Sequence, residues 1–273
     1  NKQGYVSYCE SHDEERMQYH AKKNGTSYLK NTEYARLCRI AVNVAFNVLL
    51  AGPHMIWQFE EIGYDFSINS SEDSPNGTSS DNRCAKKPRP EKAGYFDHPI
   101  RQSQFVKVAQ TIHLRTQLLK DKFIELGKPT KADIGGKVVR TIQWGNDVFV
   151  AGNFSADKTQ TVDIPSGTWF NYLAQMEQTS TQMTLAPGEL VILTAEPVAL
   201  PIIANSLTAV EDIEVDPTMD ILPPYNVHIY TASGQFIRSQ MNVMQADLSG
   251  MQRGAYIVQY EKNGQRVAEK VIR

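Results

Sequence analysis

A histidine and an aspartate stand side by side just after a short apolar strand. The strand is predicted from Gly4 to Cys9, and Ser11, His12 and Asp13 follow it. A carboxylate at the C-terminal end of a buried strand is where parallel α/β barrels place their chemistry. Such an aspartate can also cap the next turn, but the neighbouring imidazole favours a functional interpretation. We therefore interpret Asp13 as the best candidate for chemistry in this chain.

A second motif follows after a predicted helix. It reads Gly-Pro-His-Met-Ile-Trp-Gln-Phe-Glu-Glu-Ile-Gly-Tyr-Asp over residues 52–65. Together the two motifs resemble the α-amylase family of glycoside hydrolases, family 13. In that family the seventh barrel strand ends in Asn-His-Asp or Ser-His-Asp, and the eighth commonly reads Gly-x-Pro-x-Ile-x-x-Gly-x-Glu-x-Gly. Ser11 and Phe59 stand where the family usually has Asn and Gly.

The resemblance implies roles for the polar residues of the first motif. Retaining glycosidases pass through an oxocarbenium-like state and need one nucleophile and one acid/base. In the family these two carboxylates end the fourth and fifth strands, and a third hydrogen-bonds hydroxyls of the distorted sugar ring. The resemblance assigns this third role to Asp13, and it implies that His12 binds the same sugar.

Two further residues are candidates for substrate binding. Arg16 lies on the loop after Asp13, and Glu61 lies just past the second strand, where it could line a cleft. The alternatives are a solvated, internally paired loop for Arg16 and a capping or ion-pairing role for Glu61. Trp57, at mid-strand, is interpreted as a core residue rather than a sugar platform.

Strand and helix signals alternate through the first half of the chain. The predicted elements are a polar loop Ser11–Asn31, a helix Thr32–Ala51, a strand Met55–Phe59, a polar loop Asn69–His98 and a helix Pro99–Leu126. Two strand–helix units cannot close an eight-stranded barrel. We therefore expect the last two units of a partial (β/α)8 barrel in a longer enzyme, with the nucleophile and acid/base upstream of Asn1.

From about Lys131 the pattern changes to short strands with period two, separated by turn residues. The predicted strands are Val138–Gln143, Asp147–Asn153, Gln160–Ile164, Thr168–Leu173, Met183–Leu185 and Glu189–Thr194. This pattern is typical of an antiparallel β-sandwich. An all-β domain also follows the barrel in the family that the first motifs resemble.

The last part of the chain carries a third set of motifs. They are Val227–Tyr230, a turn at Thr231–Gly234, Ala246–Ser249, Gly254–Val258, an Asn263–Gly264 hairpin and Lys270–Arg273. In this order they resemble the C-terminal sorting domain of the type IX secretion system of Bacteroidetes. The resemblance implies that the protein is secreted or displayed at the cell surface, with the secretion machinery as a partner.

Composition excludes several kinds of partner. The 273 residues carry a net charge of −2, which gives no field to attract nucleic acid. The short basic run from Arg83 to Lys92 is interrupted by prolines and does not change this expectation. The most apolar run, Ile40–Ala51, is too short to span a bilayer.

No metal site or cofactor is predicted in this chain. The three cysteines lack the spacing of a metal site. Glu72, Asp73 and Asp81 could bind calcium, but they lack an EF-hand spacing, and a disordered polar loop is the favoured interpretation. The resemblance leaves open whether a longer parent protein binds calcium.

The combined prediction is an α/β part followed by all-β parts. Its ranges are a partial barrel at 1–127, an antiparallel β-sandwich at 128–198, a linker at 199–220 and a small β-sandwich sorting domain at 221–273. The predicted function is that of a secreted α-amylase-type hydrolase of starch or glycogen, inactive as this fragment alone. Two alternatives stay open: a glucan branching enzyme of the same family, suggested by Ser11, and a non-catalytic glucan-binding module.

Overall fold

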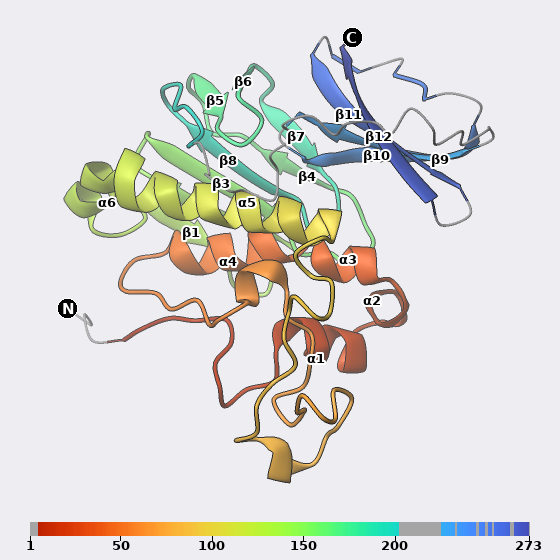
Figure 1. Cartoon of the computed structure of the whole chain (residues 1–273). Coiled ribbons are helices and arrows are strands. Elements are labelled where there is room, and N and C mark those ends of the chain that lie inside the picture. The colour runs from red at the N-terminus through yellow and green to blue at the C-terminus, as the bar shows by residue number, and fades with distance from the viewer. Residues whose placement is uncertain are drawn as a thin grey trace. The chain divides into compact units, whose positions relative to one another are not determined.

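The computed structural model describes residues 5–201, 225–232, 234–243, 246–248, 251–252, 254–262 and 265–272. The chain divides into two compact units, Asn1–Ala204 and Asn205–Arg273 (Figure 1). The first unit combines helices with antiparallel sheets, and the described part of the second is one antiparallel sheet. The predicted boundary between residues 127 and 128 lies inside the first unit, and most of the predicted linker at 199–220 lies outside the described residues.

The helices differ from the prediction at residues 11–31, at a break near Cys38, and at Leu119, which interrupts the helix predicted over Pro99–Leu126. They are α1 Met17–Asn24, α2 Ser27–Asn31, α3 Glu33–Leu37, α4 Ile40–Val48, α5 Pro99–His113 and α6 Lys120–Leu126, with 3-10 turns η1 Glu60–Ile62 and η2 Ser80–Asn82 and a π-helical turn η3 Leu114–Leu118. The predicted loop at 11–31 contains α1 and α2, whose polar sequences show no apolar stripe. The predicted end at Gly127 is confirmed, because this residue adopts a left-handed conformation with φ of 65° after α6.

The helix predicted over residues 32–51 breaks at Cys38 and Arg39. Arg39 donates hydrogen bonds of 2.7 Å from Nη1 and Nη2 to the carbonyls of Ser155 and Phe154. The turn at Gly188 packs so tightly on this break that a Cβ there would lie 3.0 Å from the Cys38 carbonyl oxygen. Tertiary contacts with the sheet therefore divide one predicted helix into α3 and α4.

The strands of the first unit form two antiparallel sheets. They are β1 Lys131–Asp133, β2 Val139–Trp144, β3 Val148–Asn153, β4 Gln160–Asp163, β5 Trp169–Asn171, β6 Met176–Gln178, β7 Gln182–Leu185 and β8 Leu190–Thr194. The larger sheet has the order β1-β2-β3-β8-β5-β6, and β4 pairs with β7 in the smaller one. The six predicted strands of this region are present with shifted ends, while β1 and β6 were not predicted.

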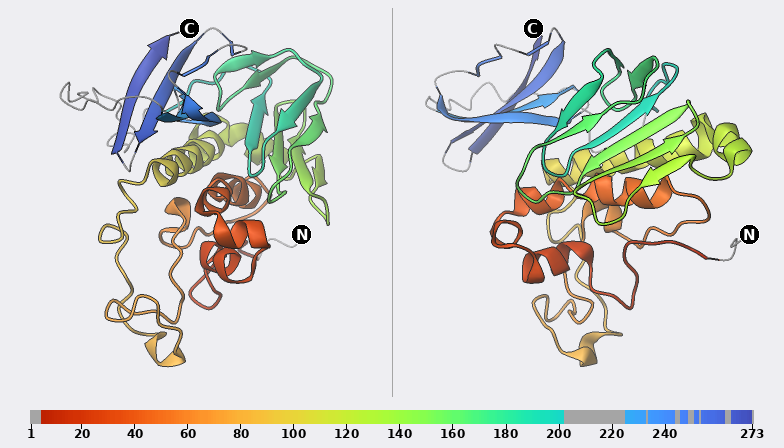
Figure 2. Two further views of the ribbon diagram at one scale, coloured as in Figure 1. Left: turned by 90° about the vertical axis from the view of Figure 1, so that its right-hand side faces the viewer. Right: turned by 180° about the vertical axis from the view of Figure 1, so that it is seen from behind.

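The two central strands, β3 and β8, are buried on both faces. Val148 and Val150 belong to a core shared with the helices, whereas Phe149 and Ala151 pack with residues of β4 and β7. This explains the continuous apolar sequence of both strands, because a strand covered on both sides needs no polar alternation. Figure 2 shows α4 and α5 along one face of the larger sheet.

Helix α4 lies unusually close to β3. A Cβ on Gly152 of β3 would come within 2.4 Å of Val42 Cγ2 and 2.7 Å of Phe46 Cε2 on the helix. Only a residue without a side chain therefore fits at this contact. The core formed here joins helices from the first half of the chain to strands from the second.

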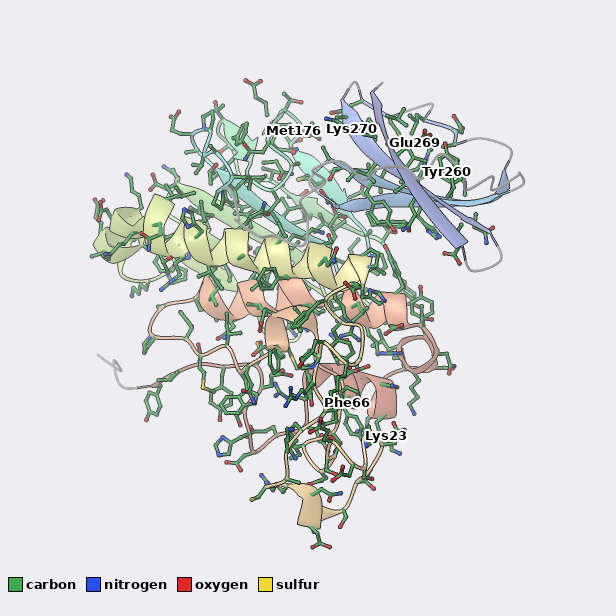
Figure 3. The ribbon with its side chains drawn as sticks, viewed as in Figure 1. Lys23, Phe66, Met176, Tyr260, Glu269 and Lys270 are labelled. Carbon is green, nitrogen blue, oxygen red and sulfur yellow. The ribbon has the colours of Figure 1, made fainter. Side chains whose placement is uncertain are left out.

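The described part of the second unit is a four-stranded antiparallel sheet with the order β10-β9-β11-β12. Its strands are β9 Tyr225–Thr231, β10 Phe236–Val243, β11 Ala255–Lys262 and β12 Gln265–Ile272. Across β11 and β12, Tyr260 Oη donates to Glu269 Oε1 at 2.7 Å (Figure 3). The described residues form one sheet where a sandwich was predicted, and a single apolar layer packs on it.

The apolar layer of this sheet centres on four buried side chains, Val227, Ile229, Tyr256 and Val258. They alternate along β9 and β11 and therefore share one face of the sheet, whereas Ile237 of β10 is exposed. The turn before β10 is also confirmed, since Gly234 N donates to the Thr231 carbonyl at 2.9 Å. Asn263 and Gly264 of the predicted hairpin lie outside the described residues.

The close approach at Gly152 gives a test of the fold. Gly152→Ala places a methyl group against Val42 and Phe46, and we expect the free energy of unfolding to fall by about 1–3 kcal/mol. Gly135→Ala is the control, because nothing lies within 4 Å of a Cβ there. Urea denaturation followed by circular dichroism measures both variants. Equal stability of the two would contradict the packing described for α4.

Candidate functional site

The candidate site forms where two segments from the first unit run in parallel. Ser7 and His54 form a parallel bridge, with Ser7 N donating to the Pro53 carbonyl at 3.1 Å and Met55 N to the Ser7 carbonyl at 2.9 Å. The strands predicted at 4–9 and 55–59 are thus reduced to one bridge within the described residues. The direction of pairing fits neighbouring barrel strands, but a partial barrel stays a prediction.

A buried asparagine of α4 ties both segments to the helix. Asn47 Oδ1 accepts from Ser7 Oγ at 2.8 Å, and Asn47 Nδ2 donates to the Met55 carbonyl at 3.1 Å. Because the amide has both a donor and an acceptor, one side chain binds two segments that lie far apart in sequence. Asn47, in a largely apolar helix, therefore positions the segments that lead into the site.

Asp13 and His12 lie together and in solvent. Their side chains are 62% and 71% exposed, and His12 Nε2 lies 3.3 Å from Asp13 Oδ2. Arg83 Nη2 donates to Asp13 Oδ1 at 2.6 Å and to the Asp13 carbonyl at 3.1 Å. Sequence reasoning missed Arg83 because it lies in the long polar loop, and no periodic signal links that loop to Asp13.

Trp57 belongs to this site, although its sequence position suggested a core residue. The side chain is only partly buried, and its ring lies 5.7 Å from the His12 ring between centroids, with the planes tilted by 43°. An aromatic face beside a carboxylate and an imidazole is a suitable surface for the apolar face and hydroxyl groups of a sugar.

Arg16, a predicted substrate-binding residue, lies in the interior. Its Nη1 donates to Glu10 Oε1 and to the Gln58 carbonyl, each at 2.9 Å, and its guanidinium lies over the Tyr64 ring at 4.8 Å from the centroid. Glu10 Oε2 also accepts from Met17 N at 2.7 Å. This buried ion pair joins the ends of both parallel segments.

Glu60 is a second buried carboxyl beside this ion pair. Its Oε2 accepts from Trp57 N at 3.1 Å, which orders the backbone next to the exposed ring. Burial raises the pKa of Glu60 to about 8, and the neighbouring Glu10 charge adds to the effect. Burial also raises the pKa of Glu10, although the Arg16 charge opposes that shift.

Phe59 adopts a left-handed backbone conformation just before η1. Its φ of 67° is uncommon for a residue with a side chain and costs on the order of 1 kcal/mol or more. This is the position where the resembled family usually has Gly, which adopts such angles freely. The Phe59 ring packs with Tyr64 at 6.0 Å between centroids, and this contact offsets part of the cost.

Glu61, the other predicted substrate-binding residue, lines an open cavity of about 480 Å³. The remaining lining comes mainly from apolar residues of α5 and includes Ile56, Phe105 and His113. Burial raises the pKa of Glu61 and favours its protonated form. The structure thus gives three environments to the candidates: Asp13 and His12 in solvent, Arg16 in the interior, and Glu61 at a cavity.

The chain has three free cysteines in contrasting surroundings. Cys9 and Cys38 are partly buried, and burial raises the pKa of both thiols. Cys84 is exposed and follows Arg83 in the sequence. Among the described residues, no group of three or more His, Cys, Asp or Glu side chains could hold a metal ion.

Comparison with known families identifies the domain at the C-terminal end of the chain. Residues 209–273 match the family described as the secretion system C-terminal sorting domain. The match includes all four strands of the second unit and begins within the predicted linker at 199–220. The sorting domain directs the protein through type IX secretion to the cell surface or the extracellular space. No helix in the described residues is long and apolar enough to cross a membrane.

No curated protein matches the chain. Similar solved structures include a maltooligosyl trehalose synthase, with a TM-score of 0.44 and 16% identity over 64% of this chain and 24% of that one. Another is a hypothetical maltooligosyl trehalose synthase of Sulfolobus tokodaii, with a TM-score of 0.42 and 16% identity over 61% of this chain and 22% of that one. The chain spans less than a quarter of either structure, and likeness of this degree supports no argument about activity.

The raised pKa of Glu60 predicts how stability depends on pH. The unfolded chain releases this proton near pH 4.5 and the folded chain near pH 8, so wild type should lose stability relative to Glu60→Gln as pH rises between these values. The slope is at most about 1.4 kcal/mol per pH unit and levels off above the folded pKa. Urea titrations from pH 5 to 9 measure it, with the exposed Glu125→Gln as control. A difference between wild type and Glu60→Gln that does not change with pH would contradict the prediction.

The sorting domain gives a second prediction, about export. In the native host, a gene truncated after residue 208 should yield protein that stays in the periplasm, because it lacks the matched domain. Cell fractionation and immunoblotting measure its location. As a control, residues 209–273 fused to a periplasmic reporter should carry the reporter to the surface or the medium. Export of the truncated protein would show that these residues do not sort it.

Proposed function

We propose that the chain is part of a secreted α-amylase-type glycoside hydrolase that cleaves α-1,4-glucosidic bonds in starch or glycogen with retention. One observation carries the proposal: an exposed carboxylate, an imidazole and an aromatic ring, from Asp13, His12 and Trp57, gather beyond the ends of two parallel segments. Carboxylates at strand ends are typical of barrel active sites. The motif resemblance supplies the substrate class.

Asp13 is proposed to stabilise the transition state. Positive charge develops on the sugar ring as the glycosidic bond breaks, and a fixed carboxylate nearby lowers the energy of that state. Its hydrogen bonds to sugar hydroxyls strengthen at the same time. His12 is proposed to bind a hydroxyl of the same sugar, with Trp57 against the ring.

Arg16 and Glu61 are proposed to contribute to substrate binding less directly. The Arg16 guanidinium holds the ends of both segments through Glu10 and Gln58, so it shapes the floor under the sugar. Glu61 lines the cavity, where its carboxyl can form a hydrogen bond with a hydroxyl group of a glucan that reaches it. The nucleophile and acid/base are proposed to lie in a longer parent enzyme, which leaves the family's branching reaction as the second candidate.

The proposal is tested first by binding. Asp13→Asn removes a charge-assisted hydrogen bond, which is worth about 1.5–3 kcal/mol, so maltoheptaose affinity should fall at least tenfold. NMR titration of the chain at millimolar sugar measures this, with Asp73→Asn, also exposed, as the matched control. The isolated chain should release no reducing sugar from starch. Equal affinity of wild type and Asp13→Asn would remove Asp13 from the sugar site.

Activity assays of a longer parent enzyme then distinguish the hydrolase from the branching enzyme and from the glucan-binding module. Asp13→Asn there should lower kcat by about two decades, or about 3 kcal/mol, without a change in Tm. Formation of α-1,6 branches would identify the transferase. Binding without any turnover would identify a glucan-binding module.

A further inference from the structure

The long polar loop after the second segment is a built structure. We call residues 67–95 the arm. Three aromatic rings hold its base together: Phe66 and Tyr95 stack at 5.9 Å between centroids, and Tyr64 lies 5.4 Å from Phe66 and 6.2 Å from Tyr95. Compact loops with closed ends and internal packing are frequently functional. The arm therefore corrects the expectation of a disordered loop.

A lysine ammonium lies at the centre of the arm. Lys87 Nζ donates to the backbone carbonyls of Ile68, Ser70 and Asn82 at 2.5, 2.9 and 2.8 Å. All three donors of the ammonium are thus used by one arm. Converging carbonyl oxygens are the ligands that hard cations also prefer, and here the chain supplies the cation itself.

A second contact anchors the start of the arm to the segment that carries Asp13. Glu15 Oε1 accepts from Ser67 Oγ at 2.7 Å, and Glu15 Oε2 accepts from Ile68 N at 2.9 Å. Ile68 is also one of the carbonyls held by Lys87. Glu15, Ile68 and Lys87 therefore form a continuous link from the site segment to the middle of the arm.

The residue at the far end of this link is Arg83. Asn82, whose carbonyl binds Lys87, ends the turn η2, and the Arg83 amide continues that turn by donating to the Ser80 carbonyl at 3.0 Å. From there the Arg83 side chain reaches Asp13 at 2.6 Å. Arg83 Nη1 and Nε make no hydrogen bond within the described residues and are free to donate to hydroxyl oxygens.

We propose that Lys87 is the internal structural cation of the arm, and that it positions Arg83 as a substrate-contacting residue beside Asp13. The inference rests on the proposed function, since Arg83 would bind the same neutral sugar as Asp13 and His12. The other charges of the arm do not explain its position, because Lys86 and Lys92 both pair with Glu72, at 2.6 Å each. Lys86 therefore provides a matched control of equal charge.

The first experiment tests the cation without any sugar. Lys87→Met should speed hydrogen exchange of the Asn82, Arg83 and Ala85 amides at least tenfold, because their turn loses its attachment. Lys86→Met should leave those rates unchanged. In Lys87→Ala, added propylammonium supplies the missing part of the side chain and should restore protection. Unchanged exchange in Lys87→Met, or no effect of propylammonium, would overturn the structural role of the ammonium.

The second experiment tests the positioning of Arg83. Lys87→Met and Arg83→Ala should both shift the carboxyl carbon NMR signal of Asp13 and lower maltoheptaose affinity at least fivefold, and Arg83→Lys should recover part of it. Lys86→Met should change neither. If wild type binds no maltoheptaose, the proposed function fails, and the exchange data and the Asp13 signal still decide whether Lys87 places Arg83. An Asp13 signal that moves in Arg83→Ala but not in Lys87→Met would refute the positioning role.

Discussion

The structure of the first unit depends on a helix that is held on both sides. Helix α4 presses its Val42 and Phe46 against β3 at Gly152, and from another position its Asn47 bonds both parallel segments. The apolar contact fixes the helix relative to the sheet, and the polar contact fixes the segments relative to the helix. The β-sheet region, which contributes no candidate site residue, therefore acts as the support on which the site is built.

Charge is distributed unevenly around that support. The interior holds the Glu10–Arg16 ion pair and Glu60, all of them buried. The ion pair is satisfied by protein, whereas Glu60 Oε1 has no hydrogen-bond partner within the described residues. Asp13 and His12, in contrast, lie in solvent, where they can exchange one partner for another at small cost. Buried, hydrogen-bonded groups that hold the segments, together with exposed groups that can change partners, suit a site that must bind and release a hydrated sugar.

The sequence predicts elements whose apolar pattern sets their conformation, and it fails where polar contacts do so. β2, β3 and β8 follow from their apolar alternation or runs, and the end of α6 follows from Gly127. The arm could not be predicted, because its order comes from side-chain contacts without a local sequence pattern: the aromatic rings at its base, the Glu15 anchor and the binding of carbonyls by Lys87. The meeting of Arg83 with Asp13, seventy positions apart, has the same cause. The backbone at Phe59 was partly predictable. The resembled motif has Gly at this position, and Phe59 adopts a left-handed conformation there.

Export of the protein has a consequence for the reactivity of its three cysteines. Outside the cell the chain meets oxidants, and a thiol reacts as its thiolate. Cys9 and Cys38 are held as neutral thiols by burial, so they resist this chemistry without a disulfide. Cys84 has no such protection and lies beside Arg83 on the arm. Of the three thiols, Cys84 is therefore the one that such oxidants reach directly, and sulfenic acid or a mixed disulfide would form there first.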